Sequence, residues 1–249
     1  MKAVVLYTFR TLLREKILFN VFGITLLFLF FGYLASQLVF GHQDRVMLNM
    51  GLMVNALSIF GVGIGAGARL FRQDIENKTI YLIISRPISR LSFFLARYLG
   101  MMIFVALNFS ILTFVLILSV KNAGGDVSHA FVQSSILTFL EASILLAGSL
   151  TLSFWLRPAL VFMAMVALIF LGHNHDMIHS LQANPETQSQ IFGFLTKITP
   201  NFSLFLMSER VFYSEALPTA DFGWALLYGL CWLFFFLLMG NAVFSRKNL

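Results

Sequence analysis

Long stretches without a charged side chain constrain this chain more than any other feature. A membrane-spanning helix needs about 20 mostly apolar residues. Six apolar runs approach or exceed that length, at 17–40, 46–68, 98–120, 134–155, 158–172 and 222–244. Hydrophobic residues make up 59% of the chain and charged residues only 11%, too few to cover so apolar a core in water. The sequence therefore predicts an all-α integral membrane protein with six transmembrane helices, forming a single domain over residues 1–249.

The distribution of basic residues predicts how the chain is oriented. Thirteen of the seventeen Lys and Arg residues flank the apolar runs on one side, which includes both termini and the loop after the second run. Cytoplasmic flanks of membrane helices are enriched in Lys and Arg, so we expect both termini in the cytoplasm. The net charge of +6 thus indicates membrane topology, and we expect no nucleic-acid partner.

Two segments outside the runs are expected to lie on the membrane surface. In residues 1–16, apolar side chains recur at helical spacing with the basic ones mostly off that face, which is typical of an amphipathic helix in the inner interface. The alternative is a plain charged flank. Residues 173–221 are too apolar for a solvated linker, so we expect short external helices before the last span.

Four glycines near the end of the second run predict close helix packing. Gly61 and Gly65 are four residues apart, as are Gly63 and Gly67. Small residues at this spacing let helix backbones approach each other closely in lipid.

Glu141 is the one acidic or basic residue inside a predicted span. Such a group usually faces protein or a water-filled cavity, so Glu141 is a candidate for a polar pathway or a dimer contact. The alternative is a carboxylate that reaches outward to the interface. Asn49, Asn55 and Asn108 could form hydrogen bonds between helices.

The histidines and the cysteine carry weaker signals. His175 and His179 are four residues apart, and with His173 and Asp176 they are weak candidates for a metal site. Histidine is also common at membrane interfaces, and we predict no metal. Cys231 is the single cysteine, which excludes a disulfide framework, and we expect it to be buried in the last span.

The loop after the second run, residues 69–90, mixes charged and apolar residues and is too short and polar to span a membrane. Pro87 cannot continue a preceding helix. A short amphipathic helix parallel to the membrane, offering its face to something in the cytoplasm, is the expected structure. The alternative is an ordinary basic cytoplasmic loop.

The same stretch resembles the permease subunits of ABC-2 type exporters, most closely the branch that includes the copper-maturation permease for nitrous oxide reductase. The resemblance rests on Asp74-x-Glu76-x-x-Thr79, Ser85-Arg86-Pro87-x-Ser89-Arg90, Arg97-Tyr-Leu-Gly100 and, at the C-terminus, Phe244-Ser-Arg246-Lys247. Asn77-Lys78 stands where the family often has Gly, and Arg97 where it often has Lys.

The resemblance implies an exporter permease of the bacterial inner membrane. Two permease copies or homologues would pair in the lipid bilayer, and separate cytoplasmic ATPase subunits would supply ATP and Mg²⁺. The loop helix would be the coupling helix that docks on the ATPase. Its expected contact residues are Asp74, Glu76, Thr79, Ile80, Leu82, Ile83, Arg86, Pro87 and Arg90.

The chain itself has no G-x-x-x-x-G-K-[ST] phosphate loop, so we expect no catalysis and no cofactor in this subunit. Two other classes stay open: an ATP-independent secondary carrier or channel, and an intramembrane metalloenzyme built around the histidines. The transported substrate, and whether the two permeases are identical, are not encoded in any motif of this sequence.

Overall fold

The computed structural model describes residues 2–14, 43–76, 89–183, 197–213 and 215–246, together with five single residues between 23 and 34. Within these ranges every regular element is a helix and there is no strand. In chain order they are α1 (Lys2–Arg14), α3 (Gln43–Glu76), α5 (Arg90–Asn122), α6 (His129–Leu152), α7 (Pro158–His173), α8 (His175–Ala183), the 3-10 turn η1 (Ser203–Phe205), α10 (Ser208–Phe212) and α11 (Thr219–Arg246).

Four helices are long and apolar enough to cross a membrane: α5, α6, α11 and the Gln43–Leu70 part of α3. The run 158–172 forms α7, an apolar helix of 16 residues that is shorter than a usual span. Most of the run 17–40 lies outside the described residues. The all-helical, membrane-compatible class is therefore confirmed, and the number of six spans stays a prediction.

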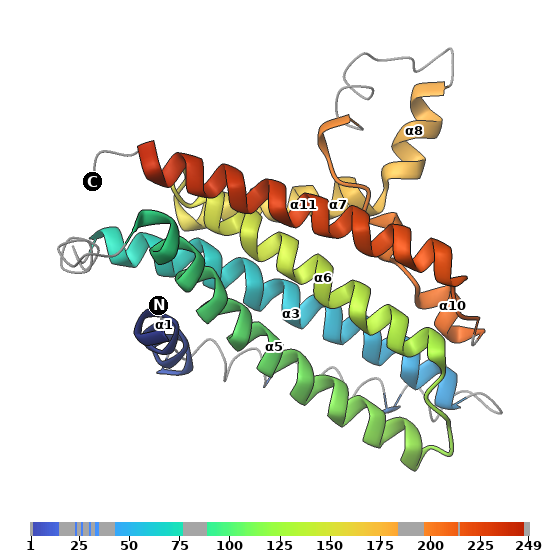
Figure 1. The fold of residues 1–249 in the computed structure, drawn as a ribbon. Helices are drawn as coiled ribbons and strands as arrows, with labels where there is room; N and C mark the ends of the chain where they lie inside the picture. The colour runs from blue at the N-terminus through green and yellow to red at the C-terminus, as the bar shows by residue number, and fades with distance from the viewer. Residues whose placement is uncertain are drawn as a thin grey trace.

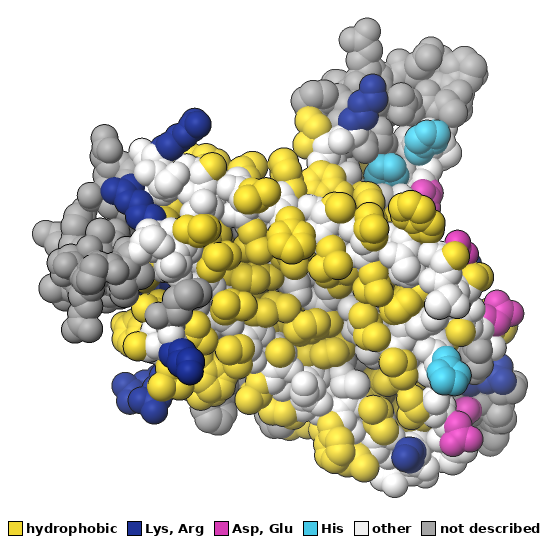
Figure 2. All heavy atoms as spheres, viewed as in Figure 1, with side chains coloured by type: hydrophobic (Ala, Val, Ile, Leu, Met, Phe, Trp, Pro, Cys, Tyr) yellow, Lys and Arg dark blue, Asp and Glu magenta, His cyan; other side chains and the backbone are white. Residues whose placement is uncertain are grey.

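The four long helices lie side by side, and α6 is in the middle of the group, packed against both α3 and α11 (Figure 1). The short helix α1 packs near the first turns of α5. Side chains on the outer face of α11, including Trp224, Phe234 and Leu238, are exposed. Figure 2 shows that hydrophobic side chains cover the flank of the molecule between its two ends, as expected for a surface that faces lipid.

The two ends of the molecule differ in charge. One end, called the basic end below, brings together α1, the last turns of α3, the first turns of α5 and the last turns of α11 (Figure 1). In Figure 2 one group of Lys and Arg side chains lies at this end and others lie toward the opposite end, where all the Asp and Glu side chains seen on this face are found. The described basic-end residues are Lys2, Arg10, Arg14, Arg69, Arg90, Arg97, Arg157 and Arg246. The charge asymmetry read from the sequence is thus present in the fold, and which side of a membrane it faces stays a prediction.

Serine and proline residues mark the beginnings of three helices. The Ser89 hydroxyl accepts a hydrogen bond from the Ser92 amide at 3.2 Å and caps α5, and Ser128 caps α6 through the Phe131 amide at 3.3 Å. Pro158 opens α7 in the first turn, where its missing N–H is not needed. Only residues 153–157 separate α6 from α7, so a tight turn joins the two helices.

The helix that contains the second run extends beyond it. Its membrane-length part, Gln43–Leu70, is close to the predicted run 46–68, but α3 continues without a break to Glu76, so the first residues of the expected loop are helical. Residues 69–76 contain neither Gly nor Pro and several good helix formers, so nothing in the local chemistry stops the helix when the apolar run ends.

The prediction of a buried cysteine was wrong. Cys231 lies in α11 as expected, but its side chain is exposed. The cause is the position of α11 at the edge of the group of helices, where only a narrow stripe of its surface, including Gly229 and Gly240, is buried.

Residues 2–14 form a helix, as expected, but the face that it buries, Val4, Thr8 and Leu12, is not the predicted apolar face, since Leu6 and Leu13 are exposed. The described part of 173–221 holds the short elements α8, η1 and α10. Of these, α10 packs on α3 and α6, and η1 packs on α6, while α8 projects away from the long helices (Figure 1). The placement of these pieces at the two membrane surfaces stays a prediction.

Candidate functional site

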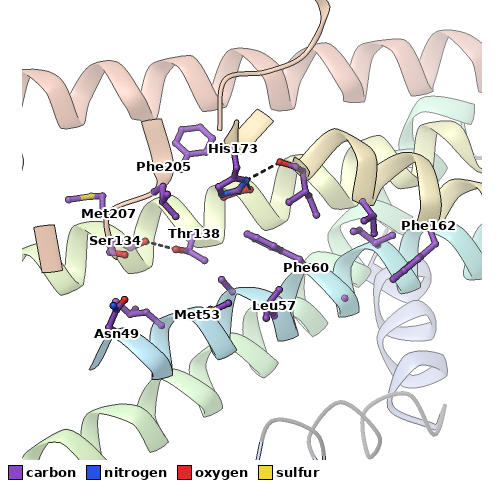
Figure 3. Close-up of a pocket in the computed structure, with 18 residues that line it drawn as sticks. Asn49, Met53, Leu57, Phe60, Ser134, Thr138, Phe162, His173, Phe205 and Met207 are labelled. Atoms are coloured by element: carbon purple, nitrogen blue, oxygen red, sulfur yellow. Dashed lines mark hydrogen bonds and ion pairs between the residues drawn. The ribbon is translucent and has the colours of Figure 1, made fainter. Parts of the chain in front are cut away.

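A cavity of about 600 Å³ lies between α3, α6, α7 and the segment around η1. Figure 3 shows Asn49, Met53, Leu57 and Phe60 reaching it from α3, Ser134 and Thr138 from α6, and Phe162 and His173 from α7. Phe205 and Met207 close it from a fourth direction. The described walls are mostly aliphatic and aromatic, and the polar groups are few.

Packing of α3 against α6 explains why the cavity lies on one side of α3. A Cβ added at Gly63 would lie 3.4 Å from the Ala142 carbonyl oxygen, and one added at Gly67 would run into Ser149. At Gly61 and Gly65 an added Cβ would meet no atom of the described residues within 4 Å. Gly63 and Gly67 therefore face α6 at close range, whereas Gly61 faces open space and is part of the cavity wall.

Glu141 and His173 form the polar part of the cavity. The Glu141 side chain is only about 3% exposed, and its Oε1 lies 3.6 Å from Nδ1 of His173. The same His173 nitrogen lies 3.1 Å from the Ile169 carbonyl oxygen, one turn earlier on α7. A nitrogen that faces a carbonyl carries the proton, so the His173 Nδ1–H donates to Ile169 and Glu141 is a longer, secondary partner.

The burial of Glu141 excludes the alternative in which its side chain reaches an interface, while a role in a polar pathway or a dimer contact stays a prediction. The carboxylate does not reach outward to an interface; it is buried and lines the cavity. Among the described residues, Glu141 Oε1 has no hydrogen-bond partner. A buried carboxylate oxygen without a donor is costly, so the position is unlike that of an ordinary structural glutamate.

Of the three asparagines predicted to form hydrogen bonds between helices, one is seen to do so. Asn55 of α3 donates from Nδ2 to the Thr113 hydroxyl of α5 at 2.9 Å. Asn49 lines the cavity instead. Asn108 is buried, and its Oδ1 has no hydrogen-bond partner among the described residues.

The residues predicted to contact an ATPase are placed only in part. Asp74 and Glu76 lie in the last turn of α3, and Arg90 opens α5, where its Nη1 donates to the Ser245 carbonyl oxygen of α11 at 2.9 Å. The flanks of the loop therefore lie at the basic end. The remaining predicted contacts lie outside the described residues: Thr79, Ile80, Leu82, Ile83, Arg86 and Pro87.

The weak metal candidates are not brought together with other ligands. Within the ranges that the structure describes, no group of three or more His, Cys, Asp and Glu side chains could hold a metal ion. Asp176 instead accepts a hydrogen bond from the Ser203 hydroxyl at 3.0 Å, which joins α8 to η1.

Sequence reasoning missed two buried polar groups. Arg97 was counted as a loop charge, yet it lies in the second turn of α5, fully buried, and its Nη1 donates to the Thr8 hydroxyl of α1 at 2.8 Å. Its guanidinium carbon lies 5.4 Å from the centre of the Tyr7 ring. His173 was considered only as a metal ligand, and its place opposite Glu141 depends on how α6 and α7 pack, which no local pattern encodes.

Comparison of the sequence with models of known protein families and with curated proteins finds no match.

Proposed function

We propose that this chain is the permease subunit of an ABC-2 type exporter in a bacterial inner membrane. Its basic end would face the cytoplasm, and a separate ATPase subunit would dock on residues 74–90. The observation that carries the proposal is where the two flanks of the motif-bearing segment lie. The flanks are the end of α3 at Glu76 and the start of α5 at Arg90, and both lie at the basic end of a set of apolar, membrane-length helices.

Contacts at that end would let a docked partner act on several helices at once. Arg90, the last residue of the Ser-Arg-Pro-x-Ser-Arg element, is hydrogen-bonded to Ser245 of α11. In addition, Phe93 and Phe94 of α5 pack against Phe244 of α11, with ring centres 5.9 and 6.4 Å apart. A force applied at the loop would therefore reach α3, α5 and α11 together.

The mechanism we propose is a population shift. ATP binding would favour one arrangement of the ATPase pair, and the docked loop would favour the matching arrangement of the helices. The sequence contains no G-x-x-x-x-G-K-[ST] element, so the proposal assigns ATP and Mg²⁺ to the partner subunit and transport to a dimer of permeases.

Charge reversal at the end of α3 tests the docking surface. We expect Glu76→Lys to remove most of a co-purifying ATPase, because a like or unmatched charge in a docking interface costs several kcal/mol. The measurement is affinity purification of the full chain from its native host in mild detergent, followed by mass spectrometry for a subunit that carries a phosphate-binding loop. The matched control is Asp126→Lys, an exposed acid at the opposite end of the molecule, which should leave the complex intact.

Two outcomes would overturn the proposal. One is the absence of any ATPase from the purified unmodified chain. The other is a Glu76→Lys variant that retains the ATPase and its ATP hydrolysis rate at the level of the Asp126→Lys control.

A second candidate function is an ATP-independent carrier, and one observation favours it. Glu141 and His173 lie close together in an apolar cavity between membrane-length helices, and secondary carriers use buried ionisable groups of this kind to move protons or ions. Purified chain in proteoliposomes discriminates the two. A pH gradient alone would drive uptake by a carrier, whereas the proposed permease would be inactive without its ATPase.

A further inference from the structure

We propose that the cavity between α3, α6 and α7 binds a lipophilic amine, a molecule with an apolar body and one protonated amino group that donates hydrogen bonds to Glu141. This inference goes beyond the proposed function, because binding would be a property of this chain alone and requires no ATPase.

The size and the walls of the cavity fit a small apolar molecule. Its volume of about 600 Å³ falls within the usual range for ligand pockets, roughly 300–1,000 Å³. The lining residues are mostly apolar, including Leu57, Ile64 and Val166. Such walls favour a ligand that buries hydrocarbon or aromatic surface.

The charge of the described lining favours a cationic group over an anionic one. Among the described lining residues, Glu141 and His173 are the only ionisable side chains, and none is Lys or Arg. An anionic head group would have to approach the carboxylate of Glu141, whereas an ammonium group would neutralise it and donate to it.

The unused hydrogen-bonding capacity of Glu141 shows where the amine would bind. Oε1 is buried and has no hydrogen-bond partner among the described residues. His173 cannot fully satisfy it, since the Nδ1 proton is directed to the Ile169 carbonyl at the shorter distance, 3.1 against 3.6 Å. A ligand N–H would supply the missing donor.

Aromatic rings around the cavity support the same ligand class. Phe60, Phe162 and Phe205 come from three different elements and all line the space (Figure 3). The faces of aromatic rings attract cations, most strongly where water is excluded. A second cavity, between α5 and α6, is also apolar but has no ionisable residue among its described lining residues, so it offers no site for an ammonium group.

The first test compares an amine with its uncharged analogue. The probe is tritiated propranolol, a naphthyl secondary amine, bound to the purified full chain in lipid nanodiscs, with binding to protein-free nanodiscs subtracted. The competitor is 3-(1-naphthyloxy)-1,2-propanediol, which keeps the ring and replaces the amine with a hydroxyl group. We expect Glu141→Gln to weaken propranolol binding by about tenfold or more, and to change the affinity for the diol by less than about twofold.

Two controls accompany this variant. Glu215→Gln, which neutralises an exposed acid that does not line the cavity, should bind propranolol like the unmodified chain. Glu141→Asp keeps the charge on a shorter side chain and should retain part of the affinity. Equal propranolol affinity in the unmodified chain and Glu141→Gln would overturn the proposal. So would a diol that binds the unmodified chain as tightly as the amine does.

The second test fills the cavity with a new side chain on α3 and uses another glycine of the same helix as the control. An added side chain at Gly61 or at Gly65 meets no described atom near its Cβ, but only Gly61 lines the cavity. We expect Gly61→Leu to abolish propranolol binding and Gly65→Leu to preserve it. Unchanged binding in both variants, or equal loss in both, would show that the ligand is not held in this cavity.

The two proposals fail separately. The binding assay contains no ATPase and the co-purification assay contains no amine, so loss of one result leaves the other standing.

Discussion

The substitution Gly67→Leu is expected to lower the melting temperature of the detergent-solubilised protein by about 5 °C or more. A side chain at this position would run into Ser149, and its Cβ would lie 3.0 Å from the Leu150 backbone nitrogen. Ser149 is itself buried, and moving its hydroxyl aside would break the hydrogen bond that it donates to the Leu146 carbonyl. Overpacking of this kind costs about 1–3 kcal/mol, and sometimes more.

Gly65→Leu is the matched control for this prediction. It adds the same side chain half a turn earlier on α3, where no described atom lies within 4 Å of the new Cβ, and should change the melting temperature little. The measurement is thermal unfolding followed by size-exclusion chromatography or intrinsic fluorescence. If both variants melt at the same temperature, α3 and α6 are not in the close contact that the structure shows.

Replacing Arg97 with methionine should release α1 from α5. The guanidinium group is fully buried and donates to Thr8 of α1, and a hydrogen bond from a charged group is worth about 1.5–3 kcal/mol. Close packing at Gly100, where an added Cβ would lie 2.6 Å from the Thr8 Cβ, would be lost with it. The measurement is maleimide labelling of Val4→Cys, a buried position on α1, in a Cys231→Ser background. Labelling should accelerate about tenfold or more.

Arg157→Met controls for the loss of a basic residue at the same end of the molecule. Arg157 is exposed in the turn before α7, so its replacement should leave the labelling of Val4→Cys slow. A labelling rate in Arg97→Met equal to that of Arg157→Met would mean that other contacts hold α1 in place.

The membrane-length helices were predictable because their signal is local. Charge-free runs of more than 20 residues, such as 98–120 and 222–244, are recognised one at a time, and α5 and α11 contain them. The places where the helices end were less predictable. The apolar run after Val46 stops at Ala68, but α3 continues to Glu76, because the charged residues that follow are still good helix formers.

Burial within the membrane-length helices was the least predictable property. In water an apolar residue inside a helix is expected to be buried, but in lipid both faces of a helix can be apolar, and hydrophobicity does not distinguish them. Cys231 is exposed on α11 for this reason, while Arg97, counted as a loop charge, is buried. Only the packing of α1 on α5 reveals the second case.

Only part of the candidate site could be predicted from the sequence. Glu141 could be singled out because an acid within an apolar run is rare. The residues that make its position distinctive, His173 and the aromatic side chains of the cavity, come from α3, α7 and η1. Their meeting depends on helix register and on the turn at 153–157, which are tertiary properties.

In the predicted six-span arrangement, the shortness of α7 would make membrane thickness a variable for this protein. Sixteen residues rise only about 24 Å, less than the roughly 30 Å of hydrocarbon in an average bilayer. Two carbonyl groups at the C-terminal end of α7 accept hydrogen bonds from the protein itself. The Phe202 amide donates to the Gly172 carbonyl at 3.0 Å, and the Asn174 side chain donates to the Phe170 carbonyl at 2.8 Å. Such a helix is matched best by short acyl chains, so thicker bilayers should strain the wall of the cavity that α7 forms.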